Sequence, residues 1–227
     1  MNAKKLAADK AVELVKDGMI VGLGTGSTAF FAIQKIGERI KDGLKIRAVA
    51  SSLASTELAR LAGIPLAGMT EISSIDITID GADEVDEYCN LTKGGGGALT
   101  REKILAYNSK LFIVIVDESK LSRRLGKFPV AVEVVPFGYN LALLHLEKLG
   151  CKAVVRQKKD QFFKTDNGNW IVDCRFNEIR DPEALNTAIN NIPGVIESGL
   201  FSNKLVHSVI VGHENGDVKI LTSSLSR

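Results

Sequence analysis

Short apolar runs alternate with amphipathic stretches through the first half of the chain. Four of the runs have the length of buried strands, at residues 19–24, 45–50, 75–80 and 111–116. Apolar residues at helical spacing lie before and between them, at residues 3–15, 29–40, 55–62 and 99–106. Strands that alternate with helices predict a parallel sheet with both faces covered.

The pattern changes near Pro129. Strands are expected at residues 130–135, 152–156, 170–174 and 195–201, with helices at residues 139–149 and from Pro182 onward. An Asn-Gly pair at residues 167–168 predicts a hairpin turn before the third of these strands. The order β-α-β-β-α-β is typical of a ferredoxin-like unit.

Two further strands, at residues 206–211 and 218–221, are expected to return to the first sheet. The sequence therefore predicts an α/β fold in which a small ferredoxin-like α+β domain is inserted into a Rossmann-like domain with a parallel sheet. The expected boundaries place residues 1–128 and 204–227 in the Rossmann-like catalytic domain and residues 129–203 in the small domain.

Composition and charge exclude several classes of function. The 227 residues are 45% hydrophobic and 25% charged, and the net charge of +2 comes without a basic block, so nucleic acid is not an expected partner. No apolar run is long enough to span a membrane, and the charged N-terminus lacks the apolar core of a signal peptide. Three cysteines without a CxxC pair suit reduced thiols in a cytoplasmic protein.

The three histidines show no metal-ligand spacing and lie outside the glycine-rich stretch. A general base in this protein is therefore expected to be a carboxylate.

Polar clusters follow the predicted strands directly. These clusters are Gly24–Thr28, Ser51–Glu57, Asp80 with Asp83, and Asp117–Lys120. Ligands of open parallel sheets bind beyond the carboxyl ends of the strands. Because every cluster falls at such an end, the sequence predicts one shared ligand site there.

The turn Gly24-Thr-Gly-Ser-Thr28 joins a strand to a helix, an arrangement that directs backbone N–H groups at an anion. A dinucleotide fingerprint is incomplete here, because Ser27 replaces its third glycine and the next strand ends in serines rather than an acidic residue. Three hydroxyl side chains in the turn suit a phosphate monoester. A tight turn in which Ser27 or Thr28 caps the helix explains the same residues.

The stretch from Ile75 to Lys103 carries the candidate acid–base chemistry. Asp80 ends a strand that the pattern predicts to be buried, and Lys93 precedes four consecutive glycines. A flexible linker is one explanation of such glycines, and close approach of a ligand to bare backbone N–H groups is the other. Asp86 and Glu87 are expected to lie in a solvated acidic loop.

Glu102 follows the glycines and shares a predicted helix face with Leu99, Leu105 and Ala106. A half-buried carboxylate has a raised pKa, which a base working near neutral pH requires. The alternative is a surface glutamate on a helix of different register. A carboxylate base, a cation and N–H donors together suit proton abstraction beside a carbonyl, with the donors stabilising an enediolate.

These motifs together resemble the ribose-5-phosphate isomerase type A family across nearly the whole chain. They are Gly24–Thr28, Asp80-Gly-Ala-Asp83, Lys93–Lys103, Gly126-Lys-Phe-Pro129, Asp181-Pro182 and Ile192–Val195. The resemblance implies interconversion of ribose 5-phosphate and ribulose 5-phosphate in the non-oxidative pentose phosphate pathway, without metal or cofactor. It also implies a homodimer or homotetramer.

The resemblance assigns a role to each matching residue. Glu102 matches the base that moves a proton between C2 and C1, and Asp80 and Asp83 match carboxylates that hold sugar hydroxyls. Lys93 and the amides of Gly94, Gly95 and Gly96 match the groups that stabilise the enediolate. The remaining matches contact the substrate and its phosphate: Thr25, Gly26, Ser27, Thr28, Gly81, Ala82, Lys120 and Lys4.

Two points qualify these assignments. Lys4 on its own is typical of a solvated helix face. Some relatives carry an acidic residue where this chain has Leu53, so a substrate contact from the serine-rich loop is not implied.

Other functions fit the pattern less well. An aminosugar-phosphate isomerase or deaminase would be expected to pair a histidine with a carboxylate in the site. A sugar-phosphate sensor of a transcription regulator would need a DNA-binding segment, and a nucleotide-binding domain would need the complete fingerprint.

Overall fold

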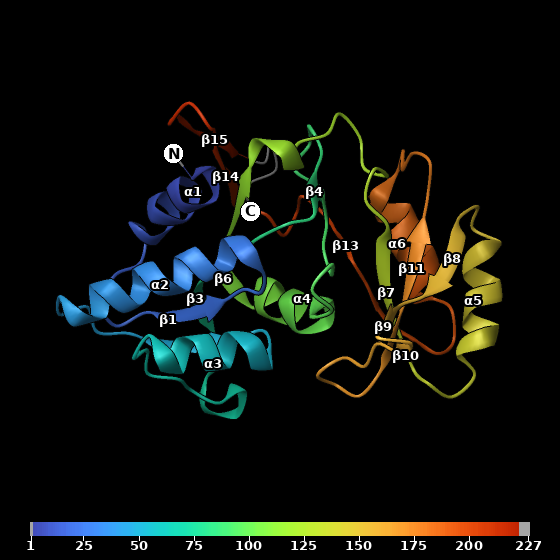
Figure 1. Cartoon of the computed structure of the whole chain (residues 1–227), viewed down its shortest axis with the longest axis horizontal. Helices are drawn as coiled ribbons and strands as arrows, with labels where there is room; N and C mark the ends of the chain where they lie inside the picture. Colours follow the sequence, from blue (N-terminus) through green and yellow to red (C-terminus); the bar gives the residue numbers. More distant parts are fainter. Residues whose placement is uncertain (1, 223–227) are drawn as a thin grey trace. The chain divides into compact units, whose positions relative to one another are not determined.

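A computed structural model describes residues 2–222, which form two compact units (Figure 1). The first unit contains the described residues up to Ala82, Arg101–Lys120 and those from Asn203 onward. The second unit contains Asp83–Thr100 and Leu121–Ser202. The fold class is the predicted one: an α/β protein with a parallel central sheet and smaller antiparallel sheets.

A six-stranded sheet forms the centre of the first unit, in the order β15-β14-β6-β3-β1-β2. Five strands run parallel, and β15 pairs antiparallel with β14 at one edge. The strands are β1 (Ile20–Leu23), β2 (Arg47–Ala50), β3 (Ile75–Asp80), β6 (Ser109–Asp117), β14 (Ser208–Gly212) and β15 (Val218–Thr222).

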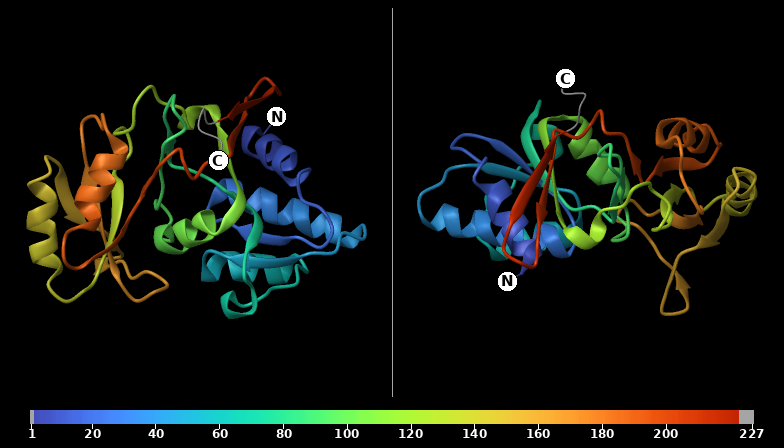
Figure 2. Two further views of the ribbon diagram at one scale, coloured as in Figure 1. Left: turned by 180° about the vertical axis from the view of Figure 1, so that it is seen from behind. Right: turned by 90° about the horizontal axis from the view of Figure 1, so that it is seen from above.

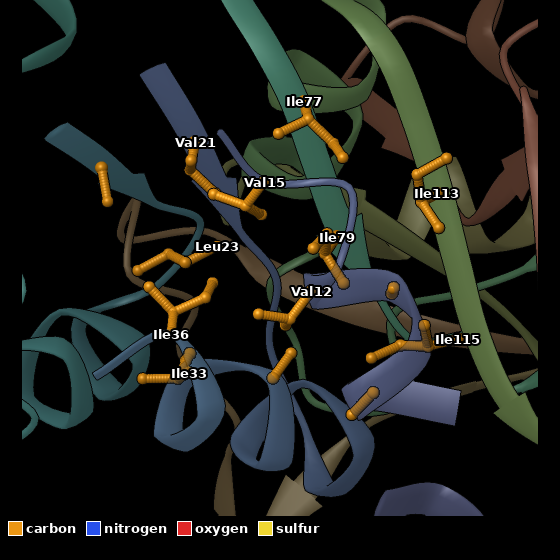
Figure 3. Packing of buried hydrophobic residues seen from close by; sticks show 14 of the residues in the cluster. Val12, Val15, Val21, Leu23, Ile33, Ile36, Ile77, Ile79, Ile113 and Ile115 are labelled. Atoms are coloured by element: carbon orange, nitrogen blue, oxygen red, sulfur yellow. The ribbon is translucent and has the colours of Figure 1, made fainter. Parts of the chain in front are cut away.

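Amphipathic helices bury the apolar residues of these strands. Val12, Val15, Ile33 and Ile36 pack with strand residues such as Ile79 in one core (Figure 3). The helices and 3-10 turns of this part are α1 (Ala3–Val12), α2 (Ser27–Lys41), α3 (Leu53–Leu61), η1 (Met69–Glu71), α4 (Leu99–Tyr107) and η2 (Glu118–Lys120). The predicted helix at residues 3–15 therefore ends three residues early.

A four-stranded antiparallel sheet forms the main layer of the second unit, in the order β12-β7-β11-β8. Figure 2 shows helices α5 and α6 beside this sheet. They contribute Ala142, Leu146 and Ile189 to one core with its strands. The elements are β7 (Val130–Val134), α5 (Tyr139–Glu147), β8 (Lys152–Val155), β11 (Trp170–Arg175), α6 (Pro182–Asn190) and β12 (Val195–Ser198). Their order and pairing are those of the predicted ferredoxin-like unit.

Two smaller sheets complete the second unit. The first joins β13 (Leu200–Phe201), β5 (Leu91–Thr92) and β4 (Glu84–Val85), and the second pairs β9 (Gln157–Lys158) with β10 (Gln161–Phe162). The sequence predicted one strand over residues 195–201, but Gly199 divides it between two sheets. A Cβ atom at Gly199 would lie 2.2 Å from the carbonyl oxygen of Lys93, so only glycine allows this approach.

The observed division differs from the expected domain boundaries. Residues 83–100 and 121–128, expected in the Rossmann-like domain, belong to the second unit. Glu84 is one reason, because its buried carboxylate accepts hydrogen bonds from the N–H groups of Gly126, Lys127 and Phe128 (3.1–3.2 Å). The pairing of β5 with β13 is the other.

Within residues 2–222, every helix is too short or too polar to cross a lipid bilayer.

Candidate active site

The first unit brings three of the predicted clusters to one edge of its sheet. Strands β1, β3 and β6 are neighbours, and Leu23 of β1 lies opposite Ile79 of β3. Asp80 in turn lies opposite Val114 of β6. The turn after β1, Asp80 and the η2 turn after β6 therefore all follow the carboxyl ends of adjacent parallel strands, where such sheets bind ligands.

Asp80 holds the turn that follows β1. Its side chain is fully buried, and Oδ1 accepts hydrogen bonds from the N–H groups of Thr25 (3.0 Å) and Gly81 (2.7 Å). A Cβ atom at Gly24 would lie 2.1 Å from the same oxygen, so glycine is needed there for close packing. The Asp80 carboxylate is thus part of the turn's structure as well as a predicted substrate contact.

Helix α2 begins directly after this turn. Its N-cap is Gly26, at φ 108°, and no side chain caps the helix. The alternative in which Ser27 or Thr28 caps the helix is therefore wrong, because both residues already belong to its first turn. An N-terminus without a side-chain cap directs backbone N–H groups and the positive end of the helix dipole outward, as an anion site requires.

The three hydroxyls of the turn have different surroundings. Thr25 Oγ1 lies 2.8–3.1 Å from the hydroxyl oxygens of three buried serines that follow β2, which are Ser51 and Ser52 in the loop and Ser55 in α3. Ser55 also donates to the carbonyl oxygen of Gly24 (2.7 Å). The Thr25 hydroxyl and the serine-rich loop therefore stabilise the turn itself, which leaves Ser27 and Thr28 as the hydroxyls suited to a phosphate.

Lys4 reaches the same turn from α1. Its Nζ donates a hydrogen bond of 2.9 Å to Ser27 Oγ. The neighbouring Lys5 is exposed and pairs with Asp9 instead. The sequence alone is typical of a solvated face for both lysines, whereas the structure separates them and brings only Lys4 to the turn.

Lys120 lies in η2, the short turn that follows the carboxyl end of β6. Its side chain is half-buried, whereas the two residues before it, Glu118 and Ser119, are exposed. Glu118 accepts a hydrogen bond of 2.7 Å from His213 Nδ1, and this bond lowers the pKa of the Glu118 carboxyl. Glu118, the acidic residue two positions before Lys120, is thus hydrogen-bonded to His213.

Glu102 is buried on α4. It is 3% exposed, and Leu99, Leu105 and Ala106 on the same face are equally buried. The predicted helix register is therefore confirmed, and the alternative of a surface glutamate is wrong. A carboxylate in an apolar helix stripe is shielded from bulk water, which is the environment expected for a general base.

In the second unit, the small sheet of β4, β5 and β13 holds Lys93. Its backbone N–H donates to the carbonyl oxygen of Gly199 (2.8 Å), and its side chain is 3% exposed. Nζ lies 5.6 Å from the centroid of the Phe201 ring, within range of a cation–π interaction. Lys93 is therefore a buried cation with a defined position.

The four glycines form a closed turn rather than a linker. The N–H of Gly97 donates to the carbonyl oxygen of Gly94 (2.9 Å), and both residues have positive φ (83° and 99°). The N–H of Gly95 donates to Asp83 Oδ2 (2.7 Å), and a Cβ atom at Gly95 would lie 2.6 Å from Asp83 Oδ1. The fold itself therefore requires glycine at three of these four positions.

The expectation that Asp86 lies in a solvated acidic loop is wrong. It is 5% exposed and accepts hydrogen bonds from the N–H groups of Tyr88 and Asn90 and from the Asn90 side chain (2.8–2.9 Å). Burial raises the pKa of its carboxyl. Glu87 is exposed as expected. Asp86 was misjudged because a buried turn within an acidic run has the same composition as a solvated one.

Sequence reasoning missed two charged residues of the second unit. Arg156 contacts the glycine turn, and no local pattern announces this because the contact spans 62 positions. Glu133 is 1% exposed and accepts hydrogen bonds from four side chains, which are those of Thr100, Thr165, Asn167 and Asn169. A carboxylate inside the apolar run Val130–Val135 is a signal that could have identified Glu133.

The site residues predicted from the sequence thus fall into two groups. Lys4, the turn of residues 25–28, Asp80 with Gly81 and Ala82, Glu102 and Lys120 belong to the first unit. Asp83, Lys93 and Gly94–Gly96 belong to the second unit. The chain passes from one group to the other at Ala82–Asp83 and at Thr100–Arg101.

The sequence and fold both match proteins of known activity. Residues 47–216 match the family model of ribose 5-phosphate isomerase A, also called phosphoriboisomerase A. Ribose-5-phosphate isomerase A of Bacillus mycoides is 47% identical over 217 residues, which cover 95% of this chain and 98% of the relative.

Solved structures give the same result. Ribose 5-phosphate isomerase A from Methanocaldococcus jannaschii is 45% identical, with a TM-score of 0.92 over 97% of this chain and 98% of that one. A D-ribose-5-phosphate isomerase in complex with phospho-erythronic acid is 43% identical, with a TM-score of 0.94 over 98% of this chain and 100% of that one. The chain therefore belongs to the ribose-5-phosphate isomerase A family.

Proposed function

We propose that this protein interconverts D-ribose 5-phosphate and D-ribulose 5-phosphate through an enediolate. The observation that carries the proposal is the match over nearly the full length to an isomerase whose structure contains phospho-erythronic acid. That molecule carries a phosphate and a planar carboxylate, and the carboxylate resembles the planar, negatively charged enediolate. It thus indicates the kind of intermediate that this family stabilises.

Glu102 is the proposed base. It removes the proton on C2 of the open-chain aldose, and the electron pair moves to form the C1–C2 double bond while O1 becomes the oxyanion. Glu102 then returns the proton to C1, O1 gains a proton, and O2 loses one to become the ketone oxygen. The support is its 3% exposure in an apolar helix stripe, where a carboxylate is held in one orientation and away from bulk water.

Lys93 and the glycine amides are the proposed stabilisers of the oxyanion. The buried position of Lys93 and the closed glycine turn present a cation and N–H groups without the cost of ordering a flexible loop. Asp83, which is bonded to the Gly95 N–H, and Asp80 would hold sugar hydroxyls and assist ring opening.

The phosphate is proposed to bind at the start of α2. The uncapped helix N-terminus, Ser27, Thr28 and the ammonium group of Lys4 offer donors and positive charge there, and Lys120 follows the neighbouring strand β6. Gly26, Gly81 and Ala82 line the same strand ends in the proposal.

Three further properties are proposals from family membership. The enzyme would act in the non-oxidative pentose phosphate pathway, as a homodimer or homotetramer, and would need no metal or cofactor. Cytoplasmic location is supported by Cys89, Cys151 and Cys174, which are all free thiols.

The direct test is turnover of the purified protein with ribose 5-phosphate in the presence of a chelator. Ribulose 5-phosphate should accumulate to an equilibrium mixture, and the reverse reaction should reach the same ratio. Absence of product from freshly folded protein would reject the isomerase. Product that appears only after a metal is added back would reject the metal-free mechanism.

A further inference from the structure

Arg156 binds the glycine turn from a neighbouring part of the second unit. Its Nη1 donates hydrogen bonds to the carbonyl oxygens of Gly94 (2.8 Å) and Gly95 (3.1 Å). Nε donates to Asp173 Oδ2 (2.9 Å), and Nη2 donates to the other oxygen of the same carboxylate. One guanidinium group therefore joins a strand of the ferredoxin-like sheet to two consecutive peptide groups of the turn.

The backbone of Arg156 is equally constrained. Its N–H donates to the carbonyl oxygen of Ile171 (2.7 Å), and its own carbonyl accepts from the N–H of Phe163 (2.9 Å). The Phe163 ring lies 5.7 Å from the guanidinium carbon, and the Arg156 side chain is only 15% exposed. Its position is thus set on three sides by backbone pairing, a carboxylate and an aromatic ring.

These contacts set the direction of two peptide planes. A trans peptide is planar, so its N–H points opposite to its C=O. Holding the carbonyl oxygens of Gly94 and Gly95 towards Arg156 turns the N–H groups of Gly95 and Gly96 away from it. The N–H of Gly95 meets Asp83, as this geometry requires. The hydrogen bond from Arg156 to the Gly95 carbonyl fixes the direction of the Gly96 N–H in the same way.

We propose that the Arg156–Asp173 pair is a positioning unit that orients the peptide groups of the glycine turn, so that the N–H of Gly96 is directed for stabilising the enediolate. This role rests on the proposed isomerase function. Four consecutive glycines carry a large entropy cost of ordering, because each populates more backbone conformations than any other residue. The Arg156 guanidinium binds the Asp173 carboxylate with two nitrogens and the carbonyl groups of Gly94 and Gly95 with the third. These bonds restrict the backbone conformations of the two glycines.

Arginine is the residue that the geometry demands. Its rigid fork binds a carboxylate with two nitrogens while the third donates elsewhere, whereas lysine offers one point charge on a flexible stem. Lysine at position 156 would keep the charge but could not hold both the carboxylate and the two carbonyl groups. Comparing lysine with alanine at position 156 therefore separates the effect of the positive charge from the effect of the hydrogen-bond geometry.

The test compares Arg156→Ala and Arg156→Lys with Arg175→Met as a control. Arg175 is an exposed arginine two residues after Asp173 on the same strand, and it lies outside the proposed machinery. Arg156→Ala should lower kcat by roughly 10–100-fold while KM changes little, because oriented amides act on charge that develops only in the transition state. Arg156→Lys should recover only a minor part of kcat, and Arg175→Met should match the wild type.

Two readouts separate positioning from a general loss of structure. Guanidinium ion at low millimolar concentration should restore part of the kcat of Arg156→Ala, because it can occupy the vacated space beside Asp173. In ¹H–¹⁵N spectra, the amide signals of Gly95 and Gly96 should shift or broaden in Arg156→Ala, while those of the first unit stay in place.

The proposal is overturned if folded Arg156→Ala keeps wild-type kcat, or if its glycine amide signals are unchanged. It is also overturned if kcat falls but guanidinium ion restores nothing and the whole spectrum changes. Should Arg156→Ala not fold, Asp173→Asn loosens the same fork with a smaller change, and wild-type kcat in that variant would equally reject the pair. Failure of the wild type to isomerise ribose 5-phosphate would reject the enzyme function alone, because the spectra still report whether Arg156 orients the turn.

Discussion

At the scale of single residues, several candidate site side chains also hold the backbone around them. Asp80 accepts N–H groups from Thr25 and Gly81, and Asp83 accepts the N–H of Gly95. The glycines at positions 24 and 95 permit these contacts, since a Cβ atom at either one would collide with the carboxylate. Substitution of either aspartate therefore changes loop geometry together with chemistry, whereas Glu102→Gln keeps the shape of the side chain.

Glu102→Gln should lower kcat by about 10²–10⁴-fold without loss of folding, because it replaces a proton acceptor by an amide of the same shape. Steady-state kinetics with ribose 5-phosphate and a thermal unfolding curve measure the two effects. Glu87→Gln, a change of the same type at an exposed position, should leave both unchanged. Near-wild-type turnover by Glu102→Gln would assign the base to another residue.

At the scale of elements, the parallel sheet decides which clusters meet. The turn after β1, Asp80 at the end of β3 and Lys120 after β6 are far apart in sequence, and adjacent parallel strands bring them to one edge. The opposite end of the same strands is held together by Asp76. Its carboxylate accepts the N–H of Ile20 on β1 and the ammonium of Lys110 on β6, both at 2.8 Å.

Asp76→Asn should reduce stability by roughly 1 kcal/mol at pH 7. The hydrogen bond from Lys110, followed by that from Ile20, holds the pKa of the Asp76 carboxyl below its usual value of 3.8. A carboxyl whose pKa is lower in the folded state stabilises the fold above its unfolded pKa. That contribution disappears as the pH falls through the lower folded pKa.

Urea unfolding of the wild type and of Asp76→Asn at pH 7, 5 and 3.5 measures this linkage. The difference in free energy of unfolding between the two proteins should be constant from pH 7 to 5. It should become smaller below the unfolded-state pKa of the Asp76 carboxyl, which is about 4. Asp42→Asn, a change of the same type at an exposed position, is the control. A difference that grows on acidification would contradict the lowered pKa.

At the scale of the whole molecule, the chain crosses between the two units within the stretch that carries most of the candidate chemistry. The crossings at Ala82–Asp83 and Thr100–Arg101 lie within Ile75–Lys103, and the long insertion 121–202 builds the ferredoxin-like sheet and the Arg156–Asp173 pair. A substrate analogue that binds the folded protein should stabilise it against unfolding.

Phospho-erythronic acid should therefore raise the unfolding temperature in a saturable manner. A ligand that binds only the folded state adds about 2.7 kcal/mol at a hundredfold excess over its dissociation constant. Erythronic acid without the phosphate should have a much smaller effect, because it lacks the anion proposed to bind at the start of α2. Lys120→Gln should weaken the response to the phosphorylated acid, and equal shifts with both acids would contradict a phosphate site.

The sequence by itself determined the alternation of strands and helices, the polar clusters at strand ends and the burial of Glu102. Each of these follows from local periodicity, because a period of two or of 3.6 residues reports which face of an element is buried. The family resemblance was also present in the sequence, since its motifs are short and contiguous.

Only the tertiary structure decided the remaining features. The break at Gly199, the burial of Asp86, the unit to which residues 83–100 belong and the contact of Arg156 with Gly94 all depend on the path of the chain. Arg156 and Gly94 are 62 positions apart, and no local period relates them. Contacts of this kind arise from the packing of whole elements, so they become visible only after the chain has folded.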